Sequence, residues 1–333
     1  MKSVGPPTLL SAQRLASASA SLRRQSETAR IELATGRIAD LPAALGGRIG
    51  EASSLRAALE AISVRRQGLS QADLIAAVTQ RALADINEGA RSIATDALAA
   101  NGRGDNAALS TAALEARSRV EAAFSSLNTK VAGQFVFSGD ATDRAALAGA
   151  DQLLADVEAI YAGAATAADF DTALDFYFND AAGGFRTTIY QGGAGTAPTI
   201  EIAGGERGAF SARADDPAIR DVLRGLAVIA AAGGAPPSAL RDGALSSAGA
   251  AGLGGAEGVI ALRTEIGVDE RRAAEALTGL EDEEAALTEA YNAATARDPL
   301  DAATRLQALE AQLNASLLAT SRLSQLTLAN FLR

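Results

Sequence analysis

The sequence contains no histidine, no cysteine and no tryptophan, and only two of its 30 basic residues are lysines, Lys2 and Lys130. The missing histidine and cysteine exclude the commonest general base, the commonest thiol nucleophile, every disulfide and all usual zinc ligands except carboxylates. Neither lysine follows a glycine-rich loop, so the phosphate-binding pattern G-x-x-x-x-G-K-[ST] is absent. We therefore expect no catalytic residue, no cofactor and no metal site.

An exported hydrolase with a serine nucleophile is the enzymatic alternative, but the nucleophile pattern G-x-S-x-G is absent. Two acidic pairs, Asp140 with Asp143 and Asp215 with Asp216, offer too few oxygen ligands for a divalent cation, which favours solvated or capping roles. The four consecutive acidic residues 281–284 point in different directions around a predicted helix, so we interpret them as solvated surface residues.

No run of 18 apolar residues is present, so we expect no membrane span, and the N-terminus lacks the order typical of a cleaved signal peptide. The net charge is −10, yet residues 1–50 carry seven basic and three acidic residues, against 23 and 37 in the remainder. An acidic body argues against a nucleic-acid partner. The basic end fits either an acidic subunit or chaperone surface, or ordinary solvated charge.

Apolar residues make up 48% of the chain and aromatics only 4%, so alanine and the aliphatic residues dominate and favour helices. Two apolar stripes recur every three or four positions and are separated by a turn at Asn101-Gly102. A third stripe lies far downstream of both. The three stripes are Ile75, Val78, Ala82, Ile86, Ala90, Ile93 and Ala97; Leu109, Ala113, Ala116, Val120, Ala123, Leu127 and Val131; and Ala273, Leu277, Leu280, Glu284, Leu287, Tyr291 and Ala294.

The separation of these stripes predicts a helical bundle made by the two flanks of the chain, with an insertion between them. Residues 133–255 hold 20 of the 32 glycines and 10 of the 13 Phe and Tyr residues. We expect short strands there, at Phe135–Phe137, Thr187–Tyr190, Thr199–Ile202 and Ala209–Ala212, together with a few short helices. The expected fold is mainly α, an elongated coiled-coil-like bundle with a smaller, glycine-rich α+β or β outer domain.

The two ends of the chain carry apolar stripes that are narrower than those of the flanking helices, and we call these narrow stripes seams. Leu15, Leu22 and Ala29 recur every seven residues, and Leu306, Leu309, Leu313 and Leu317 form a fuller seam after the Asp298-Pro299 helix start. Leu323, Leu326 and Phe331 continue the apolar pattern. Because such narrow faces bury little, we predict that the ends are disordered in the monomer and become ordered by packing with adjacent copies of the chain.

Three segments of the flanks form a recognisable set: the turn Leu33-Ala-Thr-Gly-Arg-Ile38, the helical stretch Leu69–Ile93 and the final segment Asp298–Leu332. They resemble, in this order, the L-S-S/T-G-x-x-I/V turn, the long helix that follows it and the terminal helix of the bacterial flagellin family. The resemblance implies terminal helices at 1–45 and 299–333 that line the inner tube of an assembly. It also implies a helical wall domain at 46–132 and 256–298 and a variable outer domain at 133–255.

A further motif points to one branch of that family, the hook-associated protein 3 or hook-filament junction branch. Residues 133–142, with Gly133, Phe135, Phe137, Ser138 and Gly139, resemble its G-x-[YF]-[LVI]-F-S-G-x-x-T segment, and Tyr190-Gln191-Gly192 resembles its Y-Q-G element. We expect Phe135 and Phe137 to lie on one side of an extended segment and to plug the base of the outer domain.

This resemblance implies export without a cleaved signal peptide, through the flagellar type III channel, from a cytoplasmic chaperone to an extracellular position in the flagellum. The implied partners are adjacent copies, hook-associated protein 1 on the hook side and flagellin on the filament side, with no nucleic acid and no membrane. A filament-forming flagellin is the nearest alternative, and another exported scaffold or adhesin is a third.

Overall fold

The computed structural model describes the backbone of residues 9–46 and 49–331, and the side chains of residues 13–44, 46 and 49–322. The chain is 77% helical with a few short strands, which confirms the expected mainly α fold. It divides into two compact units: unit 1 comprises Met1–Val64 and Leu280–Arg333, and unit 2 comprises Arg65–Gly279.

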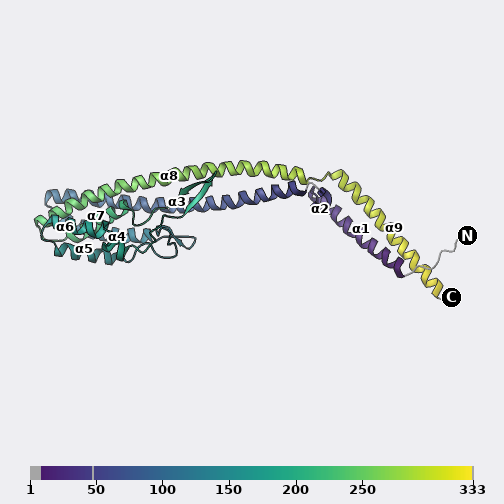
Figure 1. Ribbon diagram of the computed structural model, residues 1–333, viewed down its shortest axis with the longest axis horizontal. Helices are drawn as coiled ribbons and strands as arrows, with labels where there is room; N and C mark the ends of the chain where they lie inside the picture. The colour runs from purple at the N-terminus through teal and green to yellow at the C-terminus, as the bar shows by residue number, and fades with distance from the viewer. Residues whose placement is uncertain (1–8, 47–48, 332–333) are drawn as a thin grey trace. The chain divides into compact units, whose positions relative to one another are not determined.

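Unit 1 is built around two helices from opposite ends of the chain, α1 (Leu9–Thr35) and α9 (Pro299–Phe331), which lie side by side (Figure 1). They run antiparallel, since the Ser19 and Ser316 hydroxyls are 3.0 Å apart and Arg30 contacts Glu310 at 2.8 Å. Asp298 caps α9 by accepting a hydrogen bond from the Leu300 amide, as the Asp-Pro pair predicts. Unit 1 also contains α2 (Leu41–Leu45), the first turns of α3 (Ile49–Arg103) and the last turns of α8 (Ala239–Thr295).

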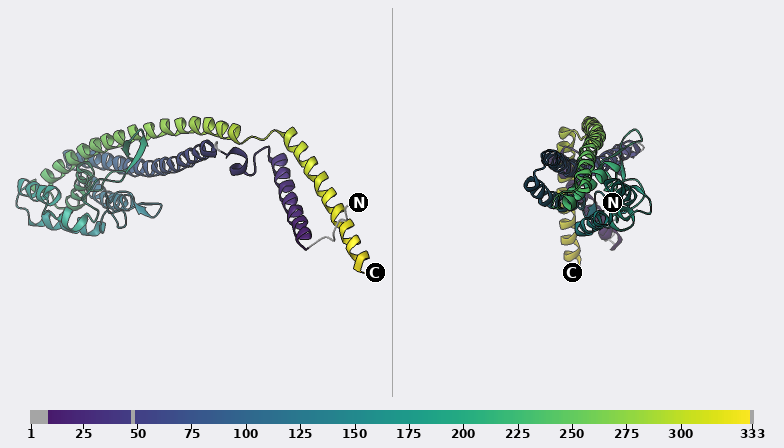
Figure 2. Two further views of the ribbon diagram at one scale, coloured as in Figure 1. Left: turned by 45° about the vertical axis from the view of Figure 1, so that its right-hand side comes forward. Right: turned by 90° about the vertical axis from the view of Figure 1, so that its left-hand side faces the viewer.

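Unit 2 places most of α3 and α8 side by side, although the two helices lie far apart in the sequence (Figures 1 and 2). The Asn87 side-chain amide donates to the Ala256 carbonyl at 2.7 Å, and the Gln80 amide donates to the Arg263 carbonyl at 2.8 Å. These contacts agree with the predicted pairing of the two flanks. The remaining helices of the unit are α4 (Asn106–Leu127), α5 (Ala150–Gly163), α6 (Ala167–Asn179) and α7 (Pro217–Ala232), with α7 packed against α4 and α5.

The first two predicted stripes face inward, whereas in the third only Ala273 and Leu280 are buried and the other members are half-buried. Every member of the second stripe that lies in α4 is buried, and Ala82, Ile86, Ala90, Ile93 and Ala97 are buried in α3. The turn between α3 and α4 contains Gly104 at φ +65°, close to the predicted break. One assignment in the second stripe was wrong: α4 ends at Leu127, and Val131 belongs to β1 (Lys130–Val131), because the Asn128 side chain leaves the helix to pair with the Leu147 backbone.

The central segment is more helical than predicted. Thr199–Ala203 forms β3, as expected, paired with β4 (Glu206–Ala209) through a turn at Gly204-Gly205. Two predicted strands are shorter or displaced, since β2 is only Gln134–Phe135 and β4 ends at Ala209.

The segment Thr187–Tyr190 was wrongly assigned as a strand. Its first three residues belong to a π-helical turn, Phe185–Ile189, and Tyr190 follows that turn with extended backbone. The Phe185 and Ile189 side chains are fully buried. Burial of these two side chains therefore decides the local backbone against the strand propensity of the sequence.

The beginning of α8 was also misjudged, since the helix starts at Ala239 and not near residue 256. Its glycines, which disfavour a helix in isolation, are used for close packing. A Cβ added at Gly252 would lie 3.2 Å from the Ala94 side chain, and one at Gly255 would lie 2.6 Å from the Val222 amide nitrogen. Helix approach at this distance favours glycine over larger residues.

By length and composition, α8 also holds an 18-residue window apolar enough to cross a membrane. In the fold, 39% of this window is buried. The small residues at its start pack against α3 and α7, where Asn87 also binds its backbone. Part of the apolar character of α8 is therefore explained by close packing within unit 2.

Candidate functional site

The predicted assembly helices form one seam in unit 1. Ala29 and Leu309 are buried, and Leu15, Leu22, Leu306 and Leu313 are half-buried between α1 and α9. Leu317 is an exception, because it is 42% exposed and points away from the seam. Ser316, which contacts Ser19 of α1, takes the seam position expected for Leu317. The side chains of Leu323, Leu326 and Phe331 lie outside the described residues.

The flagellin-like turn at residues 33–38 ends α1 and joins it to the other end of the chain. Gly36 adopts φ +65°, which a residue without Cβ tolerates, and its amide closes the helix on the Glu32 carbonyl. The Ile38 amide then donates to the Thr295 carbonyl and the Arg297 amide to the Gly36 carbonyl, both at 2.9 Å. We call residues 36–39 with 295–297 the elbow. It pairs the turn motif with the segment between α8 and α9.

Among the residues of unit 1 whose side chains the structure describes, Glu32 is the most buried charged group, with a side chain only 3% exposed. Its Oε1 accepts a hydrogen bond from the Ala39 amide at 3.3 Å. Its Oε2 lies 3.4 Å from Arg297 Nε and 4.0 Å from Arg305 Nη1, without hydrogen-bond geometry to either. The sequence reasoning did not single out Glu32, although a carboxylate one turn beyond Ala29 on the same seam is a detectable signal.

The outer surface of the helix pair keeps several large apolar residues in contact with solvent. The exposed fractions are 74% for Leu300 and 64% for Leu318. Ile31, Leu33 and Leu317 are also exposed. Unit 1 therefore presents several apolar side chains outside its own seam.

In unit 2, the segment 133–142 begins with the turn of a two-stranded hairpin. Ala132 at φ +50° and Gly133 at φ +84° connect β1 to β2, as in a type I′ turn. Phe137 is fully buried, whereas Phe135 is half-buried and holds the Lys130 ammonium 4.3 Å from the centre of its ring. The two aromatic rings therefore occupy different environments, and only Phe137 lies in the core.

The second branch motif, Tyr190-Gln-Gly, packs directly against the first. The Gly193 amide donates to the Ser138 carbonyl at 2.8 Å, and the Tyr190 hydroxyl donates to the Gly193 carbonyl at 2.9 Å. Gly139 adopts φ +63°, and a Cβ there would lie 2.9 Å from the Gly195 carbonyl oxygen. We name residues 138–140 and 190–195 the loop cluster. It brings together two motifs that are well separated in the sequence.

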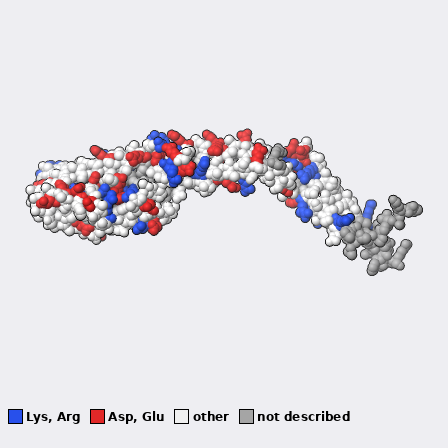
Figure 3. All heavy atoms as spheres, viewed as in Figure 1, with Lys and Arg blue, Asp and Glu red and all other residues white. Residues whose placement is uncertain are grey.

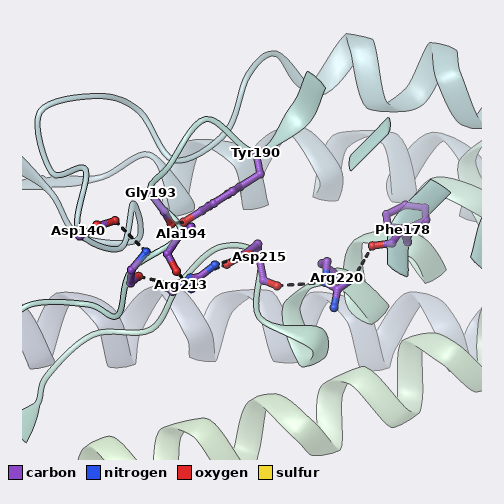
Figure 4. Close-up of polar contacts among 9 residues, drawn as sticks. Asp140, Phe178, Tyr190, Gly193, Ala194, Arg213, Asp215 and Arg220 are labelled. Carbon is purple, nitrogen blue, oxygen red and sulfur yellow. Dashed lines mark hydrogen bonds and ion pairs between the residues drawn. The ribbon is translucent and has the colours of Figure 1, made fainter. Parts of the chain in front are cut away.

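Two arginines tie the loop cluster to the helices (Figure 4). Arg213 donates to the Ala194 carbonyl at 2.8 Å and forms a two-point ion pair with Asp215, which raises the pKa of Arg213. Arg220 donates to the Asp215 and Phe178 carbonyls, and its burial lowers the pKa of its guanidinium. Burial also raises the pKa of the Tyr190 hydroxyl. Neither arginine was predicted, because their partners include backbone carbonyls distant in sequence.

An apolar pocket of about 240 Å³ lies between α3 and the two hairpins. Its apolar lining comprises Ile75, Val131, Phe135, Val136, Pro198, Ile200 and Phe210. Among the described residues, no group of three or more acidic side chains could hold a metal ion. On the face in Figure 3, acidic and basic side chains are interspersed over the helices.

Comparison with solved structures supports the fold. A protein from Vibrio parahaemolyticus, provisionally named a flagellar hook-associated protein, superposes with a TM-score of 0.55 at 14% identity, covering 75% of this chain and 99% of its own. Neither a protein-family profile nor a curated protein sequence matches this chain. At this identity the likeness establishes a shared fold, and it is consistent with the resemblance to the flagellin family.

Proposed function

We propose that this protein is a structural, non-enzymatic subunit of the bacterial flagellum. The observation that carries the proposal is the elbow with its helix pair, in which the flagellin-like turn at residues 33–38 packs on the start of the flagellin-like terminal helix. The fold shared with the Vibrio protein supports the same assignment. The apolar residues outside the seam, including Leu300 and Leu318, provide contacts for neighbouring subunits.

Within the flagellum, we assign the protein to the junction between the hook and the filament. The basis is the loop cluster, where the 133–142 and 190–192 motifs of the junction branch form one hydrogen-bonded unit. In this role the protein packs with adjacent copies, with hook-associated protein 1 on one side and with flagellin on the other. It leaves the cell through the flagellar export channel, released by a cytoplasmic chaperone.

Deletion of the gene distinguishes a junction protein from a filament flagellin. For a junction protein we expect electron micrographs with hooks but without filaments, and flagellin recovered from the medium. A complementing copy of the full chain should restore filaments. Filaments that persist after deletion would contradict the junction role, and long tubes polymerised by the purified protein alone would favour a flagellin.

Ordering of the terminal helices on assembly provides a second test. The seam of α1 and α9 buries few large side chains, so we expect the helical content per chain to rise when the monomer joins an assembly. Circular dichroism of the monomer and of the incorporated protein measures this rise. Identical helicity in both states would refute coupled ordering while leaving the flagellar assignment open to the deletion experiment.

A further inference from the structure

The seam between α1 and α9 does not by itself specify how the helices align lengthwise. The inward positions of α1 are Leu15, Ser19, Leu22, Ser26 and Ala29. A shift by one heptad replaces Leu15 by Leu22 and Ser19 by Ser26, so the α1 side of the seam largely repeats itself. On α9 the same shift replaces Leu306 by Leu313, although it exchanges Leu309 for Ser316 or Ala302. A slip of one heptad, about 10.5 Å, therefore keeps the leucine and serine contacts of α1 and the Leu306 or Leu313 contact of α9, and it loses the burial of Leu309.

Glu32 distinguishes the observed alignment from a slipped one, because the residues one heptad away cannot replace its arginine partners. In the observed alignment its buried carboxylate meets Arg297 and Arg305. A slip in one direction would place Gln312 where Arg305 stands, and a slip in the other would place Asp298 there. The first leaves a buried carboxylate facing a neutral amide, and the second places it against a like charge. Both arrangements are costly for a group that is 3% exposed.

We propose that Glu32 is a positioning residue that selects the register of the terminal helix pair. Its contacts reach the loop after α1, the segment before α9 and α9 itself, through the Ala39 amide, Arg297 and Arg305. The Glu32 carboxylate thus contacts both segments of the elbow and also α9. Because desolvation of a buried carboxylate offsets much of its attraction to the two arginines, Glu32 contributes mainly to specificity and little to net stability.

Disulfide trapping in the full chain tests the register directly, because the protein contains no cysteine of its own. The double variant S19C/S316C reports the observed alignment, since the two hydroxyls are 3.0 Å apart. The double variant S26C/S316C reports an alignment slipped by one heptad. With Glu32 intact, we expect oxidation to cross-link only the first pair within one chain.

Glu32→Gln removes the charge with little change in shape, and Glu32→Leu removes it while adding apolar contact that keeps the helices paired. In both variants we expect the slipped cross-link to rise roughly tenfold and the observed one to fall. The matched control is Glu27→Gln, an exposed carboxylate on the same helix, which should leave both cross-links unchanged.

Three results would overturn the proposal. The first is an unchanged S19C/S316C cross-link, without slipped product, in both Glu32 variants. The second is loss of both cross-links together with loss of helicity in both variants, which would make Glu32 a stability element only. The third is failure of the S19C/S316C pair to cross-link when Glu32 is intact. None of these measurements requires a flagellar partner. They are made under conditions in which circular dichroism shows that the terminal helices are formed, because the proposed function expects these helices to order fully on assembly.

Discussion

Unit 1 and unit 2 are both helical, but they bury very different side chains. The fully buried phenylalanines of unit 2 are Phe137, Phe170, Phe178, Phe185 and Phe210. In the described part of unit 1, the buried apolar residues are three alanines, Ala29, Ala52 and Ala302, and three aliphatic residues, Ile62, Leu280 and Leu309, with no buried aromatic ring. Unit 2 therefore has an aromatic core of its own, whereas unit 1 has a narrow apolar seam between two helices.

The two units also use polar groups differently. In unit 2, buried arginines such as Arg220 donate hydrogen bonds to backbone carbonyl groups. These bonds satisfy carbonyl groups that no helix or sheet hydrogen bond could satisfy. In unit 1, the buried Glu32 faces two arginines without hydrogen-bond geometry. The first arrangement stabilises a single folded state, and the second discriminates between alternative pairings.

The largest expected effect comes from opening the core of unit 2. Phe178→Ala removes a fully buried ring stacked on Phe185, and we expect a loss of about 3–5 kcal/mol in the free energy of unfolding of unit 2. Phe176→Ala, on the same helix but 57% exposed, is the matched control. Urea unfolding, monitored by tyrosine fluorescence, measures the stability of both variants. An equal loss of stability in the two variants would mean that Phe178 does not belong to a tightly packed core.

Backbone strain in the loop cluster gives the next effect. Gly139→Ala combines a φ of +63° with a Cβ only 2.9 Å from the Gly195 carbonyl oxygen, so we expect a loss of about 1–3 kcal/mol. Gly149→Ala is the control, because Gly149 has a φ of −77° and nothing within 4 Å of an added Cβ. If the two variants unfold at the same urea concentration, the loop cluster does not constrain unit 2.

Because the seam of unit 1 buries less apolar surface than the core of unit 2, we expect a substitution there to cost less stability. Leu309→Ala should weaken the helix pair by about 1–2 kcal/mol, below most closed-core values, because the two helices can collapse partly into the space. The exposed Leu318→Ala serves as the comparison. Hydrogen exchange over 15–32 and 302–316 reports the local opening. Faster exchange that spread throughout unit 2 would contradict the separation of the two units.

The smallest effect concerns pH. Burial raises the pKa of Asp216, although the Ala218 amide that it caps partly opposes the shift. A raised pKa means that the folded state holds the proton more tightly, so Asp216 contributes stability below its ordinary pKa of 3.8, and this is lost as pH rises through the folded value.

Asp216→Asn keeps an oxygen to cap α7 and removes the buried charge. We expect slightly higher stability of unit 2 at neutral pH and a weaker decline with rising pH above the ordinary value of 3.8. Unfolding midpoints from about pH 4 to pH 8 measure this dependence. Asp143→Asn, at an exposed position, is the comparison. A lower midpoint for Asp216→Asn at neutral pH would contradict the sign.

The sequence alone determined the helical character of the chain, the inward stripes of α3 and α4, and the pairing of the two flanks, because helix periodicity is written in local spacing. It did not reveal that residues 239–255 are helical, since glycine disfavours an isolated helix and only contact with Ala94 and Val222 explains its use. The aromatic segment near Phe185 was misassigned for a similar reason, because burial outweighed strand propensity.

Only the tertiary structure decided which polar residues matter. Arg213 and Arg220 have no distinctive local pattern. Glu32 does lie on the seam one turn beyond Ala29, but that spacing does not reveal its partners. Partners remote in the sequence decide these roles: Arg305 contacts Glu32, and the Phe178 carbonyl accepts a hydrogen bond from Arg220. The seam spacing of the terminal helices was predictable, but their lengthwise alignment was not, because a heptad pattern is nearly unchanged by a shift of one heptad. A buried charge has no such periodicity, and the folded chain uses one at Glu32, where the two ends of the sequence meet.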